Sequence, residues 1–61
     1  MCLSSVYEIS DGRENLLCDH VTSIDLNNGA ITLTDIMGEE IVIRGVLKNI
    51  DLVKNTVKIE T

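Results

Sequence analysis

The residues best able to do chemistry stand at the start of the chain, where Met1 carries the α-amine and Cys2 carries a thiol. The amine, the amide nitrogen of Cys2 and the Cys2 thiolate can hold one metal ion in two fused five-membered chelate rings. Nitrogen and thiolate donors in one plane suit square-planar Ni(II) or Cu(II). An α-amine has a pKa of about 7.7–8.0 and a thiol about 8.5, so a metal can displace both protons near neutral pH.

Two alternatives remain open for this terminus. If Met1 is removed, the amine and thiolate of Cys2 still chelate, with the amide of Leu3 as a further donor. Cys2 can instead be a small residue that opens an edge strand, and the residues alone favour that interpretation, because a lone thiol near a terminus is a weak metal signal. The pattern therefore predicts a metal site at Met1 and Cys2 only as one of two interpretations.

The other polar candidates have simpler interpretations. Cys18 follows Leu17 in an apolar run and is expected to be a small buried hydrophobic residue. His20 is expected to be a solvated loop residue, although it is the best supporting ligand. Glu39 and Glu40 read as a charged turn whose carboxylates could recruit a hydrated cation. The chain has neither a Cys-x-x-Cys pair nor a Gly-rich phosphate loop, so we expect no enzyme.

Composition limits the partners. The 61 residues include ten acidic and five basic side chains, for a formal net charge of −5. Nucleic-acid binding depends on Lys and Arg placed against phosphates, so this balance makes RNA or DNA an improbable partner. No apolar run approaches the ~20 residues that cross a membrane. We expect a cytoplasmic protein whose two cysteines are free thiols.

Short apolar runs separated by turn signals predict strands. The expected β segments cover residues 2–9, 16–18, 21–26, 30–36, 41–53 and 57–59, with a bend at Gly45. A single helical turn over residues 16–21 is an alternative to a strand there. Asn28-Gly29 predicts a tight hairpin, because both residues tolerate positive φ. Further reversals are expected at residues 11–15, with Asp11-Gly12 as the signature, at residues 37–40 and at Lys54-Asn55.

This pattern predicts an all-β fold, with residues 1–61 as a single small domain. We expect an SH3-like barrel or a strongly bent antiparallel sheet of about six short strands, with little or no helix. The core is expected to be aliphatic, because Tyr7 is the only aromatic residue; expected core residues are Ile31, Leu33, Val46, Ile50 and Leu52. A small aliphatic core without disulfides usually needs oligomerisation, so we expect a homodimer.

Three stretches of the chain also resemble the CooT-type family of small nickel-binding accessory proteins of carbon monoxide dehydrogenase. They are the start MCLSSVY at residues 1–7, the run ITLTDIMGEE at residues 31–40, and the ending with IDL at 50–52 and VKI at 57–59. The resemblance covers nearly the whole chain. It implies a compact β-barrel-like fold, a homodimer, and Ni(II) bound through the cysteine after the initiator Met, which is Cys2 here.

The function that the resemblance implies is that of a metallochaperone. The protein would hold Ni(II) near Met1 and Cys2 and deliver it to a nickel enzyme such as carbon monoxide dehydrogenase. Members of the family have also been labelled as predicted RNA-binding proteins, but the acidic balance and the shortage of stacking aromatics argue against that role. The alternative function is a non-catalytic β-barrel module that binds protein or RNA, with Cys2 incidental.

Overall fold

The computed structural model describes residues 3–61 and contains six β-strands. The strands are β1 (Ser4–Ser10), β2 (Arg13–Asn27), β3 (Ala30–Asp35), β4 (Glu40–Arg44), β5 (Val46–Asp51) and β6 (Thr56–Glu60). No helix occurs in the part of the chain that the structure describes. The prediction of an all-β chain with about six strands is confirmed, and no helix among the described residues is long and apolar enough to cross a membrane.

The six strands form one mixed sheet in the order β4-β3-β2-β1-β6-β5. β1 and β6 run parallel, and the other neighbouring strands run antiparallel. The prediction of a closed barrel is wrong, because the edge strands β4 and β5 do not pair with each other. The prediction of a purely antiparallel sheet is also wrong, because β6 returns along β1 in the same direction.

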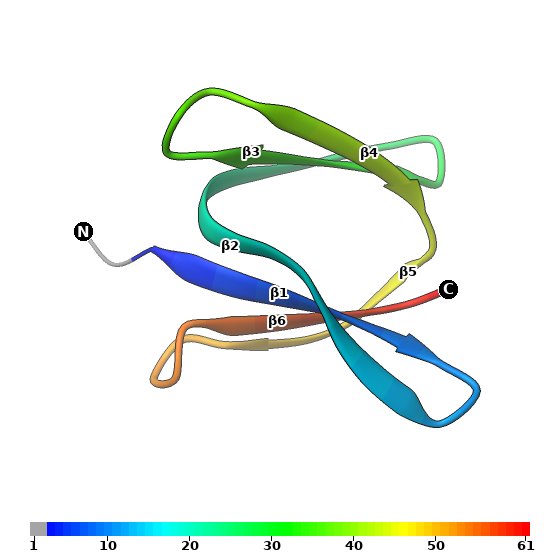
Figure 1. Cartoon of the computed structure of the whole chain (residues 1–61). Coiled ribbons are helices and arrows are strands. Elements are labelled where there is room, and N and C mark those ends of the chain that lie inside the picture. Colours follow the sequence, from blue (N-terminus) through cyan, green and yellow to red (C-terminus); the bar gives the residue numbers. More distant parts are fainter. Residues whose placement is uncertain (1–2) are drawn as a thin grey trace.

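The sheet bends through β2, which is 15 residues long. Its first half pairs with β1 and its second half pairs with β3. The register slips where Val6 faces Cys18 but Ser4 faces Val21, and His20 between them has a φ of +56°. Figure 1 shows β2 crossing from the layer of β1, β6 and β5 to the layer of β3 and β4. The sequence suggested two separate segments here, whereas a bulge joins them in one bent strand.

The core lies between the two layers and is entirely aliphatic; it consists of Val6, Val21, Ile31, Leu33, Val57 and Ile59. The predicted burial of Ile31 and Leu33 is confirmed. Burial of Val46, Ile50 and Leu52 is not found, because their side chains are 60%, 51% and 82% exposed. The first two lie on the edge strand β5 and Leu52 follows it. An apolar pattern identifies such residues as candidates for the core, but it does not show whether another element packs against them.

Gly29 and Gly45 lie at two of the predicted changes of direction. Asn28 and Gly29 have φ values of +51° and +80°, as the tight β2–β3 hairpin requires. At Gly45 the chain turns from β4 into β5, and a Cβ there would lie 2.6 Å from the carbonyl oxygen of Glu60. Gly45 is needed for this close approach of two backbones, because any side chain would collide with β6.

Candidate metal site at the start of the chain

Met1 and Cys2, the predicted metal ligands, lie outside the described residues. The described chain begins at Leu3 and enters the sheet at once. Ser4 is paired with Val21 on β2, and the Ser5 amide donates a hydrogen bond of 2.9 Å to the carbonyl of Asn55. β1 is therefore held on both sides, by β2 and by β6, from its first residues onward.

Asp19 binds the start of β1 to the bulge in β2. The Ser5 hydroxyl donates a hydrogen bond of 2.7 Å to Asp19 Oδ1, and the amide of His20 donates one of 2.9 Å to the same oxygen. The hydrogen bond from Ser5, followed by the one from His20, lowers the pKa of the Asp19 carboxyl below its usual value. Asp19 is therefore a carboxylate at neutral pH, beside the strand that leads to the amino terminus.

His20 is part of β2, so the expectation of a loop residue is wrong, although its side chain is 63% exposed as expected. Its Nδ1 lies 3.9 Å from Asp19 Oδ2. Its carbonyl accepts a hydrogen bond of 2.9 Å from the amide of Ile36, which joins the bulge to the β3–β4 turn. The bulge therefore presents a carboxylate and an imidazole together at the surface.

Cys18 is less suited to bind a metal. Its side chain is half-buried against the core, and its thiol donates a hydrogen bond of 3.6 Å to the Asp19 carbonyl. Burial raises the pKa of the Cys18 thiol, and the carboxylates of Asp35, Asp19 and Glu39 raise it further. Because the thiolate is the form that binds metals, this environment keeps Cys18 largely in its unreactive form. It is a small apolar residue, as predicted, but half-buried rather than fully buried.

Two turns built in the same way lie on the same side of the molecule as the start of β1 (Figure 1). In the β3–β4 turn, Asp35 Oδ1 accepts hydrogen bonds from the amides of Met37 and Glu39. In the β5–β6 turn, Asp51 Oδ1 accepts them from the amides of Val53 and Lys54. These bonds, from Lys54 first, lower the pKa of the Asp51 carboxyl. The predicted reversals at residues 37–40 and 54–55 are therefore found, but the turns cover residues 36–39 and 52–55. Glu40 lies in β4, and residues 52–53 lie in the turn instead of the predicted strand.

These turns and the neighbouring strands also carry exposed apolar side chains, which the sequence did not predict at this end of the molecule. Met37 is 83% exposed and Val53 is 92% exposed. Between the layers, an open groove of about 250 Å³ reaches Ser4; it is lined by Ser4, Val21, Thr22, Ser23, Ile24, Ile50, Leu52 and Val57. The end of the molecule where β1 begins therefore combines ionised carboxylates with uncovered apolar surface.

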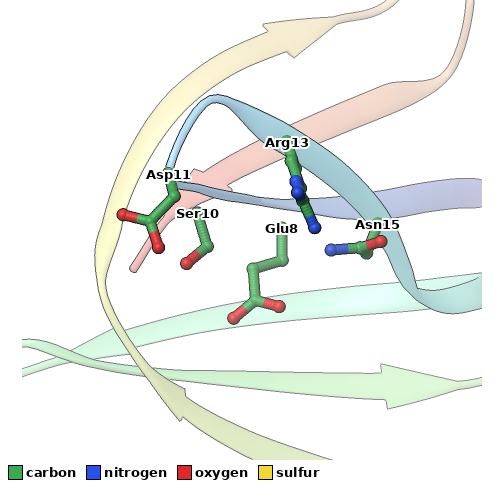
Figure 2. A pocket seen from close by; sticks show the side chains of 5 residues that line it. All are labelled: Glu8, Ser10, Asp11, Arg13 and Asn15. Atoms are coloured by element: carbon green, nitrogen blue, oxygen red, sulfur yellow. The ribbon is translucent and has the colours of Figure 1, made fainter.

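A second, polar hollow of about 470 Å³ lies at the β1–β2 hairpin and is lined by Glu8, Ser10, Asp11, Arg13 and Asn15. Figure 2 shows Arg13 near Glu8 and Asn15, with the Asp11 carboxylate set apart. Glu8 also accepts a hydrogen bond of 2.9 Å from the Thr61 hydroxyl. The sequence predicted a turn over residues 11–15 here, whereas the chain turns at Asp11 and Gly12 and β2 begins at Arg13. The hollow lacks a nucleophile paired with a base, and two carboxylates beside one guanidinium do not favour an anion.

Among residues 3–61, no group of three or more His, Cys, Asp or Glu side chains is arranged to hold a metal ion. The described residues form a small β protein with an open sheet. Its surface carries both carboxylates and exposed apolar side chains at the end where β1 begins. Its described residues bring no catalytic set together.

Comparisons with known proteins also place the chain among small, accessory β proteins. The family model described as "CO dehydrogenase accessory protein CooT" matches residues 1–60. The fold is similar to a crystal structure of a proposed CooT from Carboxydothermus hydrogenoformans, with a TM-score of 0.88, 24% sequence identity, and coverage of 97% of this chain and 95% of that one. No curated protein matches the chain.

The chain belongs to the CooT family of CO dehydrogenase accessory proteins. This membership confirms the resemblance drawn from the three sequence stretches. It also confirms the prediction that the protein is not an enzyme, because the family consists of accessory proteins that assist the maturation of one.

Proposed function

We propose that this protein is a cytoplasmic metallochaperone that binds Ni(II) and delivers it to carbon monoxide dehydrogenase, with residues 1–61 as a single domain. The ion is held by the α-amine of Met1, the amide nitrogen of Cys2 and the Cys2 thiolate. The observation that carries this proposal is a thiol at the second position of a chain that belongs to the CooT family. Planar nitrogen and sulfur donors of this kind suit Ni(II).

The surroundings of β1 support a cation at this end of the chain. Cys2 precedes Ser4, the first residue of β1, by two positions in the sequence. Ser5, the next residue, binds Asp19 directly at 2.7 Å. The ionised carboxylate of Asp19 favours a nearby cation electrostatically, and the exposed imidazole of His20 lies on the same bulge.

The contrast between the two cysteines supports the choice of ligand. Burial of the half-buried Cys18 side chain raises the pKa of its thiol, and three carboxylates raise it further. Cys2 has the α-amine of Met1 as its immediate neighbour in sequence, which gives its thiolate a second donor in the same chelate. Chelation is what allows a metal to displace the thiol proton at neutral pH, and Cys18 has no comparable partner among residues 3–61.

A site made of terminal groups also fits the delivery of an ion. A metal held by a few ligands at the end of a chain can be transferred by stepwise ligand substitution, whereas four fixed side chains around the ion would retain it. Transfer to the apo-enzyme can be followed directly. Nickel-loaded protein should activate nickel-free carbon monoxide dehydrogenase in the presence of a weak chelator that suppresses activation by free Ni(II).

We also propose that the protein is a homodimer. Among residues 3–61, ten large apolar side chains are exposed; they are Leu16, Leu26, Ile36, Met37, Ile41, Val42, Val46, Ile50, Leu52 and Val53. The described residues bury only six side chains in the core, so a chain of this size has little core of its own. A second copy of the chain would cover part of the exposed apolar surface and add to that core.

The nickel site is tested by blocking its nitrogen donor. Protein carrying an acetyl group on the terminal amine should bind Ni(II) far more weakly than the free-amine form, and a mass spectrum under gentle conditions with one equivalent of Ni(II) should show the loss. The same spectrum reports the oligomer, the stoichiometry and the retention of Met1. Equal nickel uptake by the acetylated and free forms would contradict the proposed chelate.

A further inference from the structure

β4 is an open edge of the sheet. Along its five residues, Glu40–Arg44, it pairs with β3 in an unbroken register from Thr34 opposite Glu40 to Ala30 opposite Arg44. Among the described residues, β4 packs against no strand other than β3. Its outer side therefore presents a row of backbone N–H and C=O groups without a strand partner. Such an edge is a template for pairing with a further strand.

The middle of the other edge strand, β5, is protected in two ways that the middle of β4 is not. The register of β5 with β6 breaks between Leu47 and Asn49, and a break of this kind interrupts the row of backbone groups. Lys48, at the break, points to Glu60 at a distance of 3.6 Å and carries a charge along that edge. The middle of β4 is apolar instead, and Val42 is 62% exposed. Of the two edges, β4 is the one suited to pairing.

The sequence of β4 is complementary to itself. Glu40-Ile41-Val42-Ile43-Arg44 has an acidic residue at one end, a basic residue at the other and three apolar residues between them. If two copies pair antiparallel with Val42 opposite Val42, each Glu40 lies opposite Arg44 of the second copy. Directly opposite residues share a face of the sheet, so both pairs of opposite charges form. Neither side chain has an ion-pair partner within residues 3–61.

We infer that β4 binds β4 of a second copy of this chain, antiparallel and centred on Val42, so that two six-stranded sheets join into one continuous sheet. The interface is isologous, as a two-fold symmetric contact requires. The charge order selects a second copy, because only a strand with the reverse order of charges, at the same spacing, fits Glu40 and Arg44 at once. β4 supplies that order itself.

The ends of β4 extend this contact. Antiparallel pairing centred on Val42 brings the β3–β4 turn of one copy beside the β4–β5 corner of the other. Met37 in the turn and Val46 after the corner are 83% and 60% exposed, so apolar side chains flank the paired strands at both ends. The strand-to-strand contact itself is centred on Val42. It involves none of the proposed nickel ligands.

Charge reversal tests this interface without relying on the loss of a fold. Glu40→Arg places two like-charge pairs in the symmetric contact, and so does Arg44→Glu. Each single variant should raise the dissociation constant for self-association about tenfold or more, since like charges directly opposite each other destabilise a strand pair. An equimolar mixture of the two variants restores both opposite-charge pairs and should associate as strongly as the unmodified protein. The double variant Glu40→Arg/Arg44→Glu should also regain self-association.

The measurement is sedimentation equilibrium on metal-free protein with a chelator present, so that its outcome is independent of nickel binding. Arg13→Glu, at the distant hairpin, has the same change of charge as Arg44→Glu and should leave association unchanged. The inference is overturned if the unmodified protein is monomeric, if either single variant associates as tightly as the unmodified protein, or if the mixture associates no better than its components. An assembly that persists in both single variants would place the second copy on another surface.

Discussion

The Ser5 hydroxyl lies 2.7 Å from Asp19 Oδ1, and this hydrogen bond joins the first strand to the bulge of β2 one residue away from His20. It links residues that are 14 positions apart in sequence. Together with the hydrogen bond of the Ser5 amide to Asn55, it fixes where β1, and hence the chain that precedes it, meets the sheet. Local sequence at the terminus shows none of this, because the partners are Asp19 on β2 and Asn55 in the β5–β6 turn.

Removal of the Ser5 hydroxyl should change how stability depends on pH. Asp19 has a lowered pKa in the folded protein, so the stability that its carboxylate contributes is present above the unfolded pKa of about 3.9 and is lost as pH falls through the folded pKa. Ser5→Ala should therefore be less stable than the unmodified protein near neutral pH, and the difference should shrink at about pH 2. Thermal unfolding at several pH values measures it.

The control for this prediction is Ser4→Ala, the neighbouring residue with no side-chain hydrogen bond in the described structure. NMR titration should also show the pKa of Asp19 rising toward its ordinary value in Ser5→Ala and unchanged in Ser4→Ala. A constant stability difference across the whole pH range would show that the Ser5–Asp19 contact does not depend on the carboxylate charge.

Truncation of Leu33 should be far more costly than truncation of a leucine on the surface. Leu33 is fully buried, so Leu33→Ala should destabilise the fold by about 2–5 kcal/mol, through lost apolar burial and the cavity that remains. Leu16 is 55% exposed, and Leu16→Ala should stay within about 0.5 kcal/mol. Urea unfolding of both variants provides the comparison, and similar losses in the two would argue against a core centred on β3.

A side chain at Gly45 should disrupt the corner between β4 and β5. The added Cβ would approach the Glu60 carbonyl oxygen to 2.6 Å and Ile59 Cγ2 to 3.0 Å, so Gly45→Ala should cost about 1–3 kcal/mol through overpacking. Gly12 is a useful control, because nothing lies within 4 Å of its Cβ position and only its φ of +75° disfavours a side chain. Asparagine tolerates positive φ, so Gly12→Asn should be mild while Gly45→Asn should be worse than Gly45→Ala.

Local signals explain the parts of the fold that the sequence predicted well. Asn28-Gly29 sets its own hairpin, because its two φ values depend only on those residues. The alternation through Ile31 and Leu33 likewise marks one buried face of β3. The parallel pairing of β1 with β6 joins segments about 50 residues apart, and no local pattern records it. The open sheet edges were missed as well, because neither β4 nor β5 records in its own sequence that the two strands do not pair.

The predictions for the candidate site also divide into those that local residues supported and those that required the fold. Met1 and Cys2 were proposed from donor chemistry and from the resemblance of the first residues to the CooT family, and both lie outside the described residues. Asp19 was missed, because its role depends on a register slip that places it opposite Ser5. His20 was identified as a candidate but expected in a loop, since a non-glycine residue with a φ of +56° inside a strand has no sequence signature.

Nickel titration of two cysteine variants tests the central claim most directly. Addition of Ni(II) to reduced protein should produce thiolate-to-metal charge-transfer absorption that saturates in both the unmodified protein and Cys18→Ser. Cys2→Ser should lose this absorption and most of its nickel affinity. Retention of the absorption in Cys2→Ser together with its loss in Cys18→Ser, or equal nickel affinity in Cys2→Ser and the unmodified protein, would contradict the account.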